Sequence, residues 1–187
     1  MNHEISSAFL RTIPFLIVIC VVAILMKRKK IRTEDLDIRK PFSSRFYLIW
    51  TVGFLLYTLL TEFVLYSFNI LEVSKWEHSF LPSVILILGA ILLAPIAEEL
   101  IFRGLILNVL IKKKINIHWA ILIQACFFVL LHNFTYENSQ SSNIGIVQSL
   151  IDATLFGYAR VYTKSIFTSI TMHMSGNLIA ILERFIF

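Results

Sequence analysis

One stretch of the chain decides its fold: PIAEELIFRG, residues 95–104. It places two adjacent carboxylates, Glu98 and Glu99, and the guanidinium of Arg103 inside an apolar run that covers residues 81–111. About 31 residues of straight helix would measure roughly 46 Å, whereas the hydrocarbon core of a membrane measures ~30 Å. The run is therefore expected to tilt strongly or to bend at Pro95, which cannot continue a regular helix. Ionisable groups at this depth are costly and usually face a bundle interior, so these three are candidates for a functional site.

The rest of the composition agrees with a membrane protein. Of the 187 residues, 57% are hydrophobic and only 16% are charged, which is too apolar for an ordinary soluble domain. The apolar residues form long runs without the alternation of a barrel strand. We predict an all-α, polytopic transmembrane helical bundle of about six spans, with a kinked or broken third span. The expected spans are residues 9–26, 46–71, 81–111, 116–134, 144–162 and 165–187.

The positive charges indicate topology. The chain carries a formal net charge of +5, and most Lys and Arg residues lie at the ends of apolar runs, above all in the segment 27–45. By the positive-inside rule this loop is cytoplasmic and the N-terminus is outside, in a multi-pass protein of the cell membrane. No basic patch with interleaved aromatic residues is present, so lipid is an expected partner and nucleic acid is not. We expect one structural unit, with two spans and the basic loop in residues 1–80 and a functional core in residues 81–187.

Helical spacing separates the roles of the two carboxylates. Residues four apart share a helix face, so Glu99 and Arg103 are expected to pair and neutralise each other. Glu98 lies about 100° around the helix from Glu99 and has no obvious partner on its own helix. Glu98 is therefore the expected general base, and Glu99 with Arg103 is expected to support the geometry.

Two later spans add polar side chains at the same spacing. His173 and Asn177 lie four apart on the last span, and Phe128 and His132 form a similar pair on the fourth. We expect Glu98, His132, His173 and Asn177 to converge near mid-membrane. A lone intramembrane His or Asn is more often a hydrogen-bonding group between helices, so the joint arrangement carries the hypothesis.

Three further polar residues receive simpler interpretations. Glu62, two-thirds along the second span, is expected near the outer interface rather than in a polar centre. Asp152 and Gln148 are four residues apart and are expected to bond to a neighbouring helix.

The motifs Glu98-Glu99-x-x-x-Arg103, Phe128-x-x-x-His132 and His173-x-x-x-Asn177 resemble, in this order, those of the CPBP family of intramembrane proteases. That family includes the type II CAAX prenyl endopeptidases and the bacteriocin-processing or bacteriocin-immunity (Abi) proteins. The resemblance covers residues 82–180. It implies hydrolysis of a peptide bond inside the membrane, in a substrate such as a bacteriocin, signalling-peptide or lipidated precursor.

The resemblance implies a role for each motif residue. Glu98 would activate a water that His132 orients, and His173 and Asn177 would donate hydrogen bonds to the oxyanion. The supporting residues would be Glu99, Arg103 and Phe128.

Two alternatives stay open. The first is a zinc-bound water held by Glu98, His132 and His173; without an HExxH motif we favour the metal-free mechanism, with no cofactor. The second is a non-enzymatic membrane protein, such as a bacteriocin-immunity factor or a partner of a peptide exporter.

Overall fold

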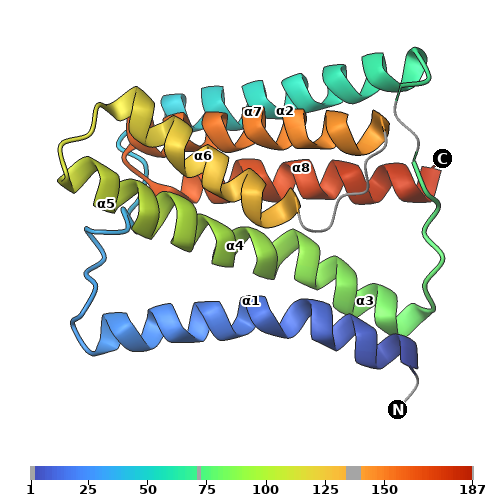
Figure 1. Cartoon of the computed structure of the whole chain (residues 1–187), viewed down its shortest axis with the longest axis horizontal. Helices are drawn as coiled ribbons and strands as arrows, with labels where there is room; N and C mark the ends of the chain where they lie inside the picture. Colours follow the sequence, from blue (N-terminus) through green and yellow to red (C-terminus); the bar gives the residue numbers. More distant parts are fainter. Residues whose placement is uncertain (1–2, 71–72, 134–139, 187) are drawn as a thin grey trace.

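The computed structural model describes residues 3–70, 73–133 and 140–186, except for the side chains of residues 132, 133 and 140–142. This part of the chain consists of helices and connecting loops (Figure 1), which confirms the predicted all-α class. The elements are α1 (His3–Lys27), α2 (Ser44–Ser67), α3 (Phe80–Leu88), η1 (Gly89–Leu93), α4 (Ala94–Glu99), η2 (Leu100–Ile106), α5 (Leu107–Lys112), α6 (Ile117–Asn133), α7 (Gln140–Thr163) and α8 (Ile166–Ile186).

The predicted spans correspond to six helical rods. The first two are α1 and α2, and the third is the continuous run from α3 to α5. Among the described residues, these three rods, His3–Lys27, Ser44–Ser67 and Phe80–Lys112, are long and apolar enough to cross a membrane. α6 is a shorter apolar helix, and α7 and α8 carry more polar residues.

The third rod bends through two π-helical segments, η1 and η2, without a break. Pro95 follows η1 and has no N–H to donate. The N–H of Ala94 donates to the carbonyl of Gly89, five residues back, and not to that of Ala90, as it would in a regular α-helix. In a π-helix the donor to the Ala90 carbonyl would be the next residue, Pro95, which has no N–H. The carbonyl of Ala90 therefore has no backbone donor from this turn. The side chain of Asn177 on α8 donates to this carbonyl at 2.8 Å. The side chain of a motif residue thus supplies the hydrogen bond that the carbonyl of Ala90 does not receive from its own helix.

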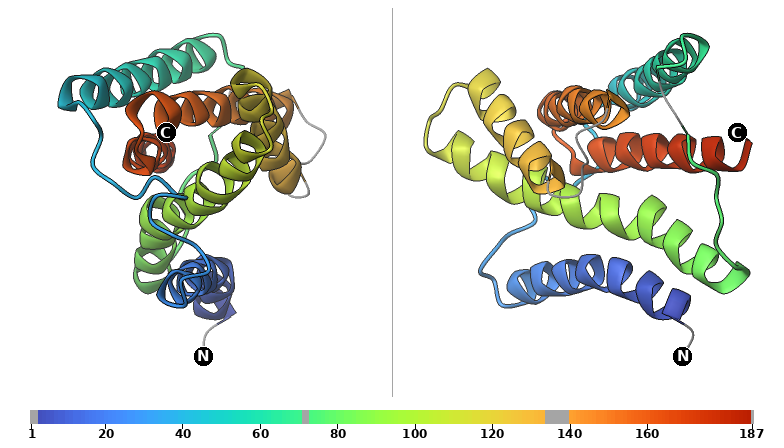
Figure 2. Two further views of the ribbon diagram at one scale, coloured as in Figure 1. Left: turned by 90° about the vertical axis from the view of Figure 1, so that its left-hand side faces the viewer. Right: turned by 45° about the vertical axis from the view of Figure 1, so that its right-hand side comes forward.

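The α3–α5 rod is the centre of the molecule. In Figures 1 and 2 it separates α1 from the four remaining helices, which pack together on its other side. α1 packs on α3, η1 and α4, whereas α8 packs on the other side of the same rod and against α2 and α7. Gly89 permits the close approach of α1, because a Cβ there would lie 2.8 Å from Oγ1 of Thr12. The residues facing α8 along the central rod therefore lie inside the bundle.

The first basic loop, residues 28–43, folds under one end of the bundle. Leu36 is completely buried, and its Cδ2 would lie 2.9 Å from a Cβ at Gly104. Asp37 forms an ion pair with the buried guanidinium of Arg160 at 3.0 Å. The loops before α2, α6 and α8 lie at the same end of the molecule, on the left in Figure 1. The positive charges expected on one membrane side are therefore gathered at one end.

Candidate active site

A buried ion pair lies at the middle of the central rod. Nη1 of Arg103 is 2.8 Å from Oε1 of Glu99, and both side chains have no exposed surface. The i, i+4 spacing brings the pair together on one face, as expected from the sequence. Nη2 of Arg103 donates to the carbonyl of Ala153 on α7 at 3.0 Å, so the guanidinium also joins two helices.

Aromatic rings surround the Arg103 guanidinium. Its Cζ lies 4.8 Å from the ring centre of Phe128, 5.1 Å from that of Phe156 and 6.0 Å from that of Phe102. Rings at these distances attract a cation through their negative faces, and they exclude lipid and water from it. Phe128, the first residue of the second motif, therefore contacts the first motif through Arg103.

His173 lies between the two glutamates. Its Nδ1 is 2.9 Å from Oε1 of Glu99, and its Nε2 is 3.6 Å from Oε2 of Glu98. Since an ionised carboxylate only accepts hydrogen bonds, the contact with Glu99 assigns the proton to Nδ1 and directs Nε2 toward Glu98. The contact of His173 with Glu98 brings the two residues together, as expected from the sequence. The contact of His173 with Glu99 was not expected, because spacing along one helix contains no information about a side chain on α8.

A polar cavity of about 350 Å³ opens beside His173 and Asn177. Three polar residues that were not assigned to the site also line it: Glu62 from α2 and Gln148 and Asp152 from α7. Nε2 of Gln148 donates to Oε1 of Glu62 at 2.9 Å, which confirms for Gln148 the predicted bond to a neighbouring helix. The expectation that Glu62 lies outside a polar centre was wrong. The sequence signal for Glu62 was its position as a lone charge in a predicted span. Its contact with Gln148 depends on how α2 packs against α7, which the sequence pattern does not show.

Glu98 lines a second cavity, of about 300 Å³, on the other side of the site. Pro14, Phe15 and Val18 of α1 form one wall, and Ile101 and Leu131 contribute to the lining. The side chain of Glu98 is 14% exposed, whereas that of Glu99 is not exposed at all. Of the two adjacent carboxylates, Glu98 is therefore the one that a reactant can reach.

His132 lies in the last turn of α6, but its side chain is outside the described residues. The structure thus brings together Glu98, Glu99, Arg103 and His173 in one network, and Asn177 lines the adjoining cavity. Within the described side chains, no three His, Cys, Asp or Glu residues form a group that could hold a metal ion. The zinc set expected from the sequence includes His132, so its geometry falls outside this finding.

A family model described as type II CAAX prenyl endopeptidase Rce1-like matches residues 80–179. The match runs from the start of α3 into α8 and includes all three motifs, whereas α1 and α2 lie outside it. No curated protein and no solved structure matches the chain.

Proposed function

The chain belongs to the Rce1-like family of type II CAAX prenyl endopeptidases, and from this membership we propose that it hydrolyses a peptide bond of a membrane-associated precursor with a water activated by Glu98. Membership supports a CAAX-type intramembrane protease as the general activity. Together with the three apolar helices, it makes this a membrane protein whose partners are lipid and a peptide or protein substrate. The observation that carries the finer proposal is the contact of His173 with both Glu98 and Glu99.

The contacts support a defined path for the proton. Glu98 takes a proton from water, and the resulting hydroxide attacks the peptide carbonyl carbon. Because Glu99 holds the proton on Nδ1 of His173, the Nε2 nitrogen can receive the proton from Glu98 over the 3.6 Å between them. While the tetrahedral intermediate exists, the Nε2–H of His173 donates a hydrogen bond to the oxyanion. As the C–N bond breaks, His173 transfers this one proton to the leaving amine. Arg103 holds Glu99 in place throughout, because the two are joined at 2.8 Å.

Asn177 and His132 complete the proposed site. One N–H of the Asn177 amide is bonded to the carbonyl of Ala90, and the amide has a second N–H that can donate to the oxyanion in the polar cavity. The loss of such a donor costs roughly 2.7 to 4 kcal/mol of transition-state stabilisation. We assign to His132 the orientation of the attacking water, on the strength of its place in the second motif.

We also propose the orientation of the protein. The end that gathers the loops before α2, α6 and α8 faces the cytoplasm, because these loops carry most of the basic residues. The N-terminus then lies outside. Bacteriocin, signalling-peptide and lipidated precursors are the candidate substrates.

Co-expression with candidate peptide precursors tests the activity. We expect mass spectrometry to find a cleaved precursor with the wild type and an intact one with Glu98→Gln. Glu77→Gln, the same chemical change at an exposed position of the loop before α3, is the matched control and should cleave normally. An immunity or export phenotype that persists in folded Glu98→Gln and His132→Ala variants would instead establish the non-enzymatic alternative. Loss of cleavage with a chelator, restored by zinc, would replace the metal-free scheme by the zinc-bound water.

A further inference from the structure

Two neighbouring cavities share Glu62 among their described lining residues. The first is the polar cavity beside His173 and Asn177. The second, about 290 Å³, is a groove between α2 and α8, lined mainly by apolar side chains such as Leu59 and Leu182. Glu62 is the residue common to both linings, so the groove and the site cavity adjoin at this side chain.

The two carboxylate oxygens of Glu62 differ in their hydrogen bonding. Oε1 accepts the hydrogen bond from Gln148, whereas Oε2 is buried and has no hydrogen-bond partner among the described residues. A buried acceptor without a donor is unfavourable, and a carboxylate at this depth more so. A ligand that brings a donor to Oε2 would remove this penalty.

The charges around Glu62 favour a cation as that donor. Asp152 lines the same cavity, and Glu183 lines the groove. No Lys or Arg is among the described residues that line either space. An ammonium or guanidinium group bound between Glu62 and Asp152 would therefore meet Oε2 of Glu62, which has no hydrogen-bond partner among the described residues, and a second carboxyl group in the same cavity.

We propose that Glu62 is a specificity-determining residue that binds a lysine or arginine side chain of the peptide substrate. Apolar residues of the same peptide occupy the groove between α2 and α8. The peptide bond that adjoins the basic residue then lies beside His173 and Asn177. This inference rests on the proposed protease function. Because α2 lies outside the matched residues 80–179, the preference comes from a part of the chain that the family model does not include.

The test uses the full-length protein in liposomes and a library of quenched fluorescent peptides with apolar flanks. Lysine and its uncharged analogue norleucine are exchanged in turn at each position around the cleavage site. We expect the wild type to prefer lysine over norleucine at one position by about tenfold or more in kcat/KM, since a charge-assisted hydrogen bond is gained. In Glu62→Gln, which still accepts from Gln148, the preference for lysine over norleucine should fall to about twofold or less.

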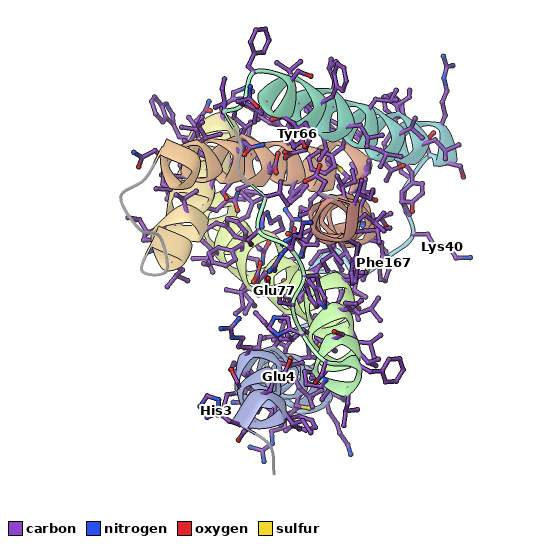
Figure 3. All side chains as sticks on the ribbon, turned by 90° about the vertical axis from the view of Figure 1, so that its right-hand side faces the viewer. His3, Glu4, Lys40, Tyr66, Glu77 and Phe167 are labelled. Atoms are coloured by element: carbon purple, nitrogen blue, oxygen red, sulfur yellow. The ribbon has the colours of Figure 1, made fainter. Side chains whose placement is uncertain are left out.

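Asp152→Asn provides a second, independent variant and should lower the lysine preference in the same direction. Glu77→Gln is the control, because Glu77, labelled in Figure 3, lies on the loop before α3 and is not among the described residues that line either cavity. A wild type that cleaves both peptides equally, or a Glu62→Gln variant that keeps the lysine preference, would overturn the inference and leave the protease function intact. A wild type that cleaves no member of the library, while Glu98→Gln behaves identically, would count against the protease function itself.

Discussion

Replacement of Arg103 by methionine tests whether the buried charges form the structural centre of the site. Both Arg103 and Glu99 have side chains with no exposed surface, and they are joined at 2.8 Å. Removal of one partner of such a pair leaves an uncompensated buried charge, which costs about 3–5 kcal/mol. In the double variant Glu99→Leu with Arg103→Met no such charge remains, and the main loss is the acceptor for Nδ1 of His173, about 1–3 kcal/mol. The double variant should therefore be more stable than the single one.

Steric trapping in bicelles measures the free energy of unfolding of the single and of the double variant. Arg28→Met is the matched control, because Arg28 is exposed and the same substitution there should change stability by less than about 0.5 kcal/mol. The reasoning is refuted if Arg103→Met unfolds within about 1 kcal/mol of the wild type, or if the double variant is less stable than the single one.

Two further predictions concern helix packing and the basic loop. Gly157→Ala should lower the free energy of unfolding by about 1–3 kcal/mol, because the new Cβ would lie 2.9 Å from Cγ2 of Ile121. Gly53→Ala, where a Cβ would meet nothing within 4 Å, should be neutral or stabilising, and equal unfolding free energies for the two variants would contradict this prediction. The hydrogen bond from Lys112 lowers the pKa of Asp35, so this contact stabilises the fold above the unfolded pKa of ~3.9 and is lost as pH falls through the folded pKa. Carboxyl NMR titration should show a higher pKa in Lys112→Met, and an unchanged pKa would show that the contact is absent in solution.

Local periodicity accounts for the features that the sequence predicted correctly. The length and apolarity of each run determine a helix, and the four-residue spacing alone brings Glu99 to Arg103. The spacing of Gln148 and Asp152 likewise indicated a contact with another helix, although it could not indicate which one.

Contacts between helices account for what the sequence reasoning missed. The sequence reasoning paired Glu99 with Arg103 alone. Nδ1 of His173 also lies 2.9 Å from Oε1 of Glu99, a contact that depends on how α8 packs against the central rod. Glu62 entered the polar cavity for the same reason, because the position of α2 decides which side of it faces inward. The bond from Asn177 to Ala90 required knowledge of the π-helical turn before Pro95, which spacing at regular helical period does not reveal.

The activity of Glu98→Gln in the purified, reconstituted protein tests the central claim most directly. Glu98 is the more accessible of the two adjacent carboxylates, and the amide of glutamine keeps its size but cannot take a proton from water. With the peptide identified by co-expression, we expect kcat to fall by about a hundredfold or more while the unfolding free energy stays unchanged. A folded Glu98→Gln variant that cleaves this peptide at the wild-type rate would contradict the account.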